Sequence, residues 1–225
     1  MSDLIDRTHA HLTRQLELIP LDVLSTPITI VGAGAVGGSA TMCLAKMGFT
    51  DLTVWDPDRV EIENFNCQWY GRADIGKLKV EALDAQITYQ TNHPLRTYAE
   101  RFRGTPSGIV VSAVDSMASR AEIWERAENA VGVKIFIDVR MSAEQLAIYA
   151  MRPMVPRDRE AYVKTLHGDD TAHHERCTAK ATMYTAMLAG GYVGKVVKDY
   201  LTTGRYPRIT TWHIGGNDLT CWSNE

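Results

Sequence analysis

The stretch from Ile28 to Gly37, with the sequence ITIVGAGAVG, constrains the fold of this chain more than any other. Its first four residues are β-branched and predict a strand that is buried on both faces. Gly32, Gly34 and Gly37 then follow in the spacing G-x-G-x-x-G, where a strand should turn into a helix. The first glycine suits a tight turn, the second lets a phosphate approach the backbone, and the third lets helix and strand pack closely. The helix, expected from about 36 to 47, would point its free N–H groups at an anion.

An acidic residue completes this pattern. A second strand, expected at 51–55, ends at Asp56, about 20 residues after the last glycine, where a carboxylate can hydrogen-bond a ribose hydroxyl. Strand, glycines, helix, strand and acid in this order predict a nucleotide-binding βαβ unit. The alternative is a glycine turn that serves close packing alone.

Strand and helix patterns continue to alternate along the chain. Further strands are expected at 95–102, 108–114, 134–137 and 145–151, and helices at 75–91 and 116–131. This alternation predicts an α/β fold of the Rossmann-like, doubly wound type, with a mostly parallel sheet. Ligands of such sheets bind beyond the carboxyl ends of the strands. Because the glycine loop, Asp56, Asp115 and Asp138 are all expected at such ends, they predict one shared site.

A single domain is expected over residues 1–225, in four parts. A helical arm at 1–20, ended by Pro20, precedes a nucleotide-binding core at 28–140. Residues 152–178 are polar and contain two prolines, which favours a mobile crossover loop. Residues 179–225 predict a long helix with a small-residue face and then a hairpin, which gives the sheet an antiparallel C-terminal extension.

Composition excludes several classes of protein. The 225 residues are 45% hydrophobic and 23% charged, which is ordinary for a soluble globular protein with a sizeable core. A net charge of −3 gives no electrostatic reason for binding nucleic acid or an anionic membrane. The N-terminal residues are too polar for a secretory signal, and no apolar run is long enough to span a bilayer. The four cysteines are widely spaced, so we expect a cytoplasmic protein without a disulfide framework or a four-cysteine zinc site.

The segment after the second strand carries the most specific pattern. It reads D-x-D-x-V-x-x-x-N-x-x-x-Q, formed by Asp56, Asp58, Val60, Asn64 and Gln68. This tract resembles the ThiF/MoeB/HesA family of adenylyltransferases, which are related to ubiquitin-activating enzymes. The resemblance extends from about residue 12 to about residue 201. It includes T-R-Q-L at 13–16, G-x-x-K at 76–79, and V-D-S at 114–116 followed by Arg120.

The resemblance implies an activity and its partners. ATP and Mg²⁺ would activate the C-terminal glycine carboxylate of a small β-grasp protein, ubiquitin-like or a sulfur carrier, as an acyl-adenylate, with release of pyrophosphate. An ionised carboxylate needs no general base to attack the α-phosphate, so the site must supply positioning and neutralise phosphate charge. Arg14 resembles the arginine that reaches into the partner subunit's site, which implies a homodimer.

The resemblance also implies roles for individual residues. Asp56 would hold the ribose, Asn64 would contact the nucleotide or its phosphates, and Lys79 would contact phosphate. Asp115 would hold Mg²⁺. The remaining nucleotide-binding candidates of this motif are Asp58 and Gln68.

Cys67 departs from the family pattern, which usually has an arginine just before this glutamine. A thiol cannot neutralise phosphate charge as a guanidinium does, so Arg59 or Arg72 of the same loop would have to substitute. Two alternatives therefore stay open. One is a noncatalytic, nucleotide-binding partner subunit. The other is an NAD(P)-dependent oxidoreductase, because the glycines and Asp56 also fit a dinucleotide fingerprint, although we find no acid or base for hydride transfer.

Cys177 is a candidate reactive residue. Relatives that form a thioester or persulfide with their carrier protein often keep a cysteine in this crossover region. The flanking Arg176 and Lys180, with the start of a helix, would lower the pKa of the thiol. The alternative is an ordinary cysteine, and the preceding histidines (His167, His173 and His174) are interpreted as solvated rather than metal-binding.

Two further pairs of residues have open or structural interpretations. Asp138 and Arg140 either line the side where the peptide enters or have a structural role. Trp69 and Tyr70 are interpreted as anchors of their loop rather than as contacts of adenine.

Overall fold

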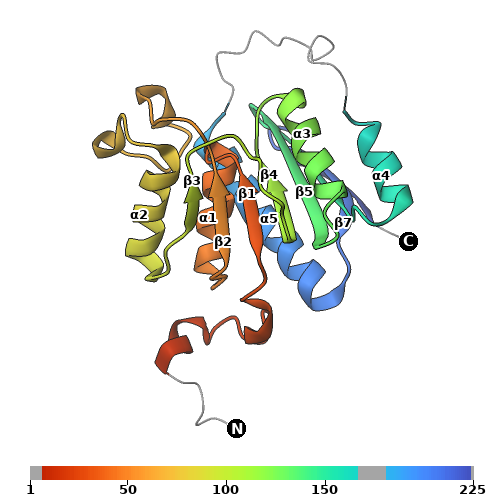
Figure 1. Ribbon diagram of the computed structural model, residues 1–225, viewed down its shortest axis with the longest axis horizontal. Coiled ribbons are helices and arrows are strands. Elements are labelled where there is room, and N and C mark those ends of the chain that lie inside the picture. The colour runs from red at the N-terminus through yellow and green to blue at the C-terminus, as the bar shows by residue number, and fades with distance from the viewer. Residues whose placement is uncertain (1–6, 167–180, 224–225) are drawn as a thin grey trace.

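An eight-stranded sheet in the order β3-β2-β1-β4-β5-β6-β7-β8 forms the centre of the protein in the computed structural model, which describes residues 7–166 and 181–223 (Figure 1). The strands from β3 to β5 are parallel, and β6, β7 and β8 continue the sheet in antiparallel fashion. The strands are β1 (Ile28–Val31), β2 (Leu52–Trp55), β3 (Arg96–Tyr98), β4 (Gly108–Ser112), β5 (Val133–Ser142), β6 (Gln145–Met151), β7 (Pro207–His213) and β8 (Asp218–Ser223). The predicted α/β fold with an antiparallel C-terminal extension is confirmed.

Helices cover both faces of this sheet, as in a doubly wound fold. They are α1 (Ala35–Lys46), α2 (Lys79–Thr91), α3 (Met117–Glu128), α4 (Pro156–Val163) and α5 (Met183–Thr203). Neighbouring residues of β4 show the two layers, since Ile109 and Val111 belong to the core with α1, α2 and α5, whereas Val110 belongs to the core with α3 and α4. This alternation explains why β4 reads as a continuous apolar run.

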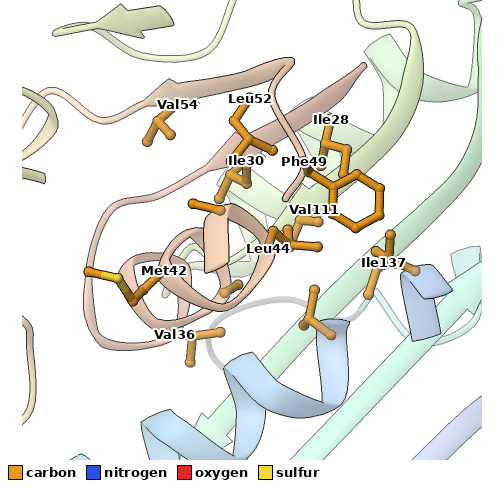
Figure 2. Packing of buried hydrophobic residues seen from close by; sticks show 14 of the residues in the cluster. Ile28, Ile30, Val36, Met42, Leu44, Phe49, Leu52, Val54, Val111 and Ile137 are labelled. Atoms are coloured by element: carbon orange, nitrogen blue, oxygen red, sulfur yellow. The ribbon is translucent and has the colours of Figure 1, made fainter. Parts of the chain in front are cut away.

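The larger core lies between the sheet and the pair α1 and α5. Ile30, Val54 and Val111 come from three adjacent strands and lie against α1 (Figure 2). The predicted small-residue face of α5 packs against α1 on the same face of the sheet. A Cβ atom at Gly190 would lie only 2.5 Å from the carbonyl carbon of Ser39, so this glycine permits the close approach of the two helices.

Over the described residues, the helical arm expected at 1–20 is not one continuous helix. A 3-10 helix spans Arg7–Leu12, turns follow to residue 18, and a second 3-10 helix spans Leu21–Val23. Tertiary contacts hold this segment instead: Leu12 packs against Gly48, and the Gln15 amide donates to the Met47 carbonyl over 2.5 Å. Short helices have little stability of their own, so such contacts decide the conformation.

The expected crossover loop at 152–178 is wrong at its beginning. Residues 156–163 form α4, which has Pro156 in its first turn, where a missing N–H costs no helical hydrogen bond. The remainder of that range from residue 167 onward lies outside the described residues, and so do His167, His173, His174 and Cys177. None of the described helices combines the length and the apolarity needed to cross a membrane.

Candidate nucleotide-binding site

The glycine loop joins β1 to α1 in the way the spacing predicts. Gly32 has φ +100°, and a Cβ atom there would lie 2.5 Å from the Ala113 carbonyl oxygen. A Cβ atom at Gly37 would lie 1.8 Å from the Gly32 carbonyl oxygen. Gly34 is the opposite case, because no described atom lies within 4 Å of the place where its Cβ would be. Two glycines are therefore required by packing, and the third leaves one side of the loop open.

The N-terminus of α1 lies at this open side. Gly34 is its N-cap, and a glycine has no side chain that could accept a hydrogen bond from the first N–H groups of the helix. The first N–H groups of a helix have no partners within the helix and carry partial positive charge. A phosphate is the kind of group that such an end binds.

Asp56 follows β2 and shapes the same loop. It is 6% exposed, its Oδ2 accepts from the Ala33 N–H over 2.6 Å, and its Oδ1 accepts from the Asp58 N–H over 2.8 Å. This role in joining the glycine loop to the following segment was not predicted. A carboxylate accepts about four hydrogen bonds, so the predicted contact with ribose is compatible with both bonds and stays a prediction.

Lys79 begins α2 and pairs with Asp58. Its Nζ donates to Asp58 Oδ2 over 2.9 Å, and its side chain is 10% exposed whereas that of Asp58 is 63% exposed. An ammonium has three donors. It can therefore contact a phosphate while it keeps the bond to Asp58, and the predicted phosphate contact stays a prediction.

The loop between these residues is fastened to the glycine loop. The Tyr70 hydroxyl donates to the Ala33 carbonyl over 2.6 Å, and Trp69 Nε1 donates to Ser39 Oγ of α1 over 3.0 Å. The interpretation of Trp69 and Tyr70 as anchors is confirmed. Asn64, predicted to contact nucleotide, accepts the Glu61 N–H through Oδ1 over 2.9 Å and so caps a short 3-10 helix, Ile62–Asn64.

Gln68 and Cys67 lie in the middle of this loop. The Gln68 Oε1 atom is buried and has no hydrogen-bond partner among the described residues. Cys67 is half-buried, and burial raises the pKa of its thiol, against smaller opposing effects of Gln68 and Lys79. The thiol is therefore neutral near pH 7 and adds no positive charge to the loop.

Asp115 lies just beyond β4, beside the glycine loop. β1 and β4 are adjacent and parallel, and the Ala113 N–H donates to the Val31 carbonyl over 2.8 Å. The chain leaves β1 for α1 on one face and β4 for α3 on the other, so this is the point where the topology switches and where ligands of such sheets bind. Asp115 is exposed there.

Arg14 lies at the opposite end of the sheet. Its neighbour Gln15 is bonded to Met47, just past the end of α1. A helix of 12 residues is roughly 18 Å long, which separates this segment from the glycine loop of the same chain. The structure therefore brings the glycine loop, Asp56, Lys79 and Asp115 together at one edge, and Arg14 does not join them within one chain.

Comparison with known proteins decides the family. The sequence model of the family described as "ThiF family" matches residues 20–211, which is most of the chain. The protein belongs to the ThiF family. Ubiquitin-like modifier-activating enzyme 5 of Xenopus laevis is 23% identical over 85% of this chain and 54% of its own length. The adenylyltransferase and sulfurtransferase MOCS3 of Anopheles gambiae is 32% identical over 44% of this chain and 25% of its own length.

Solved structures show the same fold in other proteins. MccB of E. coli, in a crystal structure with ATP, has a TM-score of 0.70 and 13% identity, covering 94% of this chain and 70% of MccB. PaaA has a TM-score of 0.73 and 17% identity, covering all of this chain and 76% of PaaA. This chain spans about half the length of the activating enzyme 5 sequence that it matches.

One prediction about the edge of this ThiF-family sheet is wrong. Asp138 was expected where a strand ends, but β5 continues to Ser142 because β6 pairs with it in antiparallel fashion. Asp138 is fully buried and lies between Arg120 and Arg140. Its role is therefore structural, and it does not line an entrance.

Proposed function

We propose that this protein is an ATP-dependent adenylyltransferase that activates the C-terminal glycine carboxylate of a small ubiquitin-like or sulfur-carrier protein, with release of pyrophosphate. The observation that carries the proposal is the meeting of the glycine loop, Asp56, Lys79 and Asp115 at the switch point of a ThiF-family sheet. The names of two relatives, an activating enzyme for a ubiquitin-like modifier and an adenylyltransferase, support the same reaction. A homodimer with Arg14 acting across the interface belongs to this proposal.

The residues present fit ATP and Mg²⁺. The open side of Gly34 and the uncapped end of α1 suit a phosphate. The unpartnered Gln68 Oε1 suits a donor such as a ribose hydroxyl or the adenine amino group, because a buried acceptor without a partner costs about 1–3 kcal/mol. Mg²⁺ is usually bound by one or two carboxylates together with substrate phosphates and water. Asp115 offers one such carboxylate, and the described residues contain no group of three metal-ligating side chains.

In this mechanism the chain binds and orients two anions that repel each other. The α1 N-terminus and Lys79 neutralise phosphate charge, and Asp56 holds the glycine loop in the shape that admits the phosphates. Mg²⁺, when bound at Asp115, supplies further neutralisation of the phosphates. The carrier carboxylate is already ionised, so the chain needs no residue to remove a proton from it.

Cys67 favours a second candidate, a noncatalytic nucleotide-binding partner subunit. The thiol is neutral and half-buried where the family pattern has a cation. Such a subunit would bind ATP without forming pyrophosphate. The reactive role of Cys177 stays a prediction under either candidate.

Pyrophosphate exchange into ATP tests these functions. The assay uses Mg²⁺ and small proteins ending in Gly-Gly. Exchange that disappears in Asp115→Ala supports the adenylyltransferase. ATP binding without exchange for every candidate supports the partner subunit, and the absence of ATP binding contradicts both and favours the oxidoreductase reading.

A further inference from the structure

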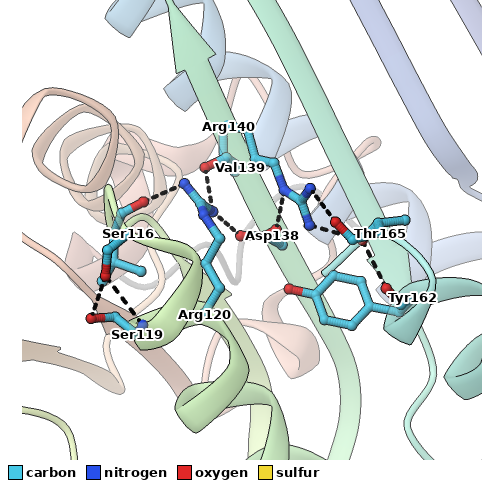
Figure 3. A network of polar contacts seen from close by, with 9 residues as sticks. Ser116, Ser119, Arg120, Asp138, Val139, Arg140, Tyr162 and Thr165 are labelled. Atoms are coloured by element: carbon cyan, nitrogen blue, oxygen red, sulfur yellow. Dashed lines mark hydrogen bonds and ion pairs between the residues drawn. The ribbon is translucent and has the colours of Figure 1, made fainter. Parts of the chain in front are cut away.

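A buried network of charges lies directly behind Asp115. Asp138 has a fully buried side chain and forms ion pairs with Arg120 through Oδ1 and with Arg140 through Oδ2, the second over 2.8 Å (Figure 3). The side chains of Arg120 and Arg140 are only 6% and 16% exposed. Arg140 also donates to the Thr165 carbonyl over 3.0 Å and to its hydroxyl over 2.8 Å. The network therefore joins α3, β5 and the segment after α4.

Arg120 extends this network to the backbone that carries Asp115. One terminal nitrogen donates to the Val139 carbonyl over 3.1 Å, and the other donates to the Val114 carbonyl. Val114 immediately precedes Asp115. On the other side, the Ser116 hydroxyl accepts the Ser119 N–H over 3.2 Å and caps α3. The exposed carboxylate of Asp115 is thus held between two fixed backbone positions.

Stability alone does not account for such an arrangement. Burying charges is costly, and replacing a buried ion pair by apolar residues of similar volume is often neutral or stabilising. What the planar fork of arginine does provide is geometry, since it fixes several acceptors at once. Mg²⁺ demands nearly ideal octahedral geometry from its ligands, and a ligand has to be held within about 0.5 Å.

We propose that Arg120 is a positioning residue for Asp115, and that Asp138 and Arg140 hold Arg120 in place. The ligand in question is Mg²⁺ with ATP, so the inference rests on the proposed function. The role of Arg120 is to fix the Val114 carbonyl, and through it the direction in which the Asp115 carboxylate points.

The chain offers a matched control at the other end of α4. Asp158 is 2% exposed and, like Asp138, lies between two arginines. It accepts from the Arg152 N–H over 3.0 Å and pairs with Arg208 over 3.2 Å. Asp158→Asn therefore removes an equally buried carboxylate that has no contact with the Asp115 segment.

The test compares Arg120→Lys with Asp158→Asn in the full chain. The first readout is amide hydrogen exchange over residues 113–119 in the nucleotide-free protein, and the second is calorimetric ATP affinity with Mg²⁺ and with EDTA. Arg120→Lys keeps the positive charge but loses the planar guanidinium that binds several acceptors at once. We therefore expect faster amide hydrogen exchange over residues 113–119 only. We also expect a loss of about 10- to 100-fold in affinity that appears with Mg²⁺ and not with EDTA. Asp158→Asn should change neither readout.

Equal effects of the two variants, or unchanged exchange over 113–119 in Arg120→Lys, would overturn the inference. If the wild-type protein binds no ATP, the proposed function fails, but the exchange readout still decides whether Arg120 positions this backbone. Asp138→Asn, where it folds, should reproduce the effect of Arg120→Lys.

Discussion

Cys67 stands at the position where the resemblance to the family leads us to expect an arginine. Its thiol is half-buried, and burial raises its pKa, so it carries no charge under ordinary conditions. Two cations of this loop are held in place: Lys79 is bonded to Asp58, and Arg59 donates to the Gly76 carbonyl over 2.7 Å. Under the proposed function, the phosphate charge that a guanidinium at position 67 would neutralise is left to these cations and to the N-terminus of α1.

Restoring the arginine should increase adenylation. In Cys67→Arg we expect pyrophosphate exchange to rise by about tenfold or more, because removing a single preorganised donor from an oxyanion site typically costs about 100-fold. Exchange kinetics at saturating ATP measure this effect. Cys67→Ser is the control, since it keeps a small neutral side chain. Unchanged or slower exchange in Cys67→Arg would show that the site does not use a charge at this position.

Lys79 and Asp58 form a pair whose members can be tested separately. Lys79→Met should weaken ATP binding by roughly 10-fold or more, because it removes a charge-assisted contact to phosphate. Asp58→Asn keeps the ammonium and should leave ATP affinity equal or improved. Asp58 is largely exposed, so neither change should lower stability by more than about 1 kcal/mol. Calorimetry with ATP distinguishes the two, and equal losses in both would mean that the pair acts only by holding the loop.

At the scale of elements, the contact between α1 and α5 fixes the direction in which α1 points at the site. Adjacent glycines of α5 test it. Gly190→Ala would bring a methyl group to 2.5 Å from Ser39, whereas Gly191 is exposed, with no described atom within 4 Å of its Cβ position. We expect Gly190→Ala to destabilise by about 1–3 kcal/mol and Gly191→Ala to stabilise by about 0.5–1 kcal/mol. Urea unfolding measures both, and a neutral Gly190→Ala would mean that α5 can move away from α1.

The elements show which parts of this fold local sequence determines. The glycine loop was predictable because the spacing of its glycines reflects local requirements of the backbone, all within ten residues. The small-residue face of α5 was predictable because its small residues recur with the period of a helix. α4 was missed because Pro156 reads as a breaker, although it is favourable in a first helical turn. The conformation of the N-terminal segment was not predictable from its own sequence. It depends on contacts of Leu12 with Gly48 and of Gln15 with Met47, which are distant in sequence.

Some features of the candidate site were likewise predictable from the sequence, and others were not. Asp56 was predicted from its spacing to the glycines, but its bond to the Ala33 N–H depends on how β1 and β2 pair. The burial of Asp138 was not predictable from its neighbours. It depends on α3 placing Arg120 over the sheet and on β6 extending β5 beyond β4. One signal was present, since Asp138 and Arg140 are two residues apart and must share a face of a strand.

At the scale of the whole molecule, Arg14 lies at the end of the sheet opposite to the proposed site. The Arg14 segment packs at the end of α1 away from the glycine loop, and Arg14 is exposed. To reach the phosphates of its own chain, Arg14 would have to pull Leu12 out of the core, where Leu12 is only 3% exposed. In a two-fold symmetric dimer the same surface meets its copy in the opposite direction, so the arginine end of one chain can face the site of the other.

Mixing two inactive variants tests this arrangement. Arg14→Ala and Asp115→Ala should each lack pyrophosphate exchange. If Arg14 acts across the interface, the hybrid dimer has one complete site, formed by Asp115 of one subunit and Arg14 of the other. Random exchange of subunits makes half of the dimers hybrid, so the mixture should recover about a quarter of the wild-type activity. If Arg14 serves its own chain, no dimer in the mixture has a complete site and no activity returns. Native mass spectrometry of the mixture shows whether hybrid dimers have formed. Hybrid dimers without pyrophosphate exchange would contradict a site shared between subunits.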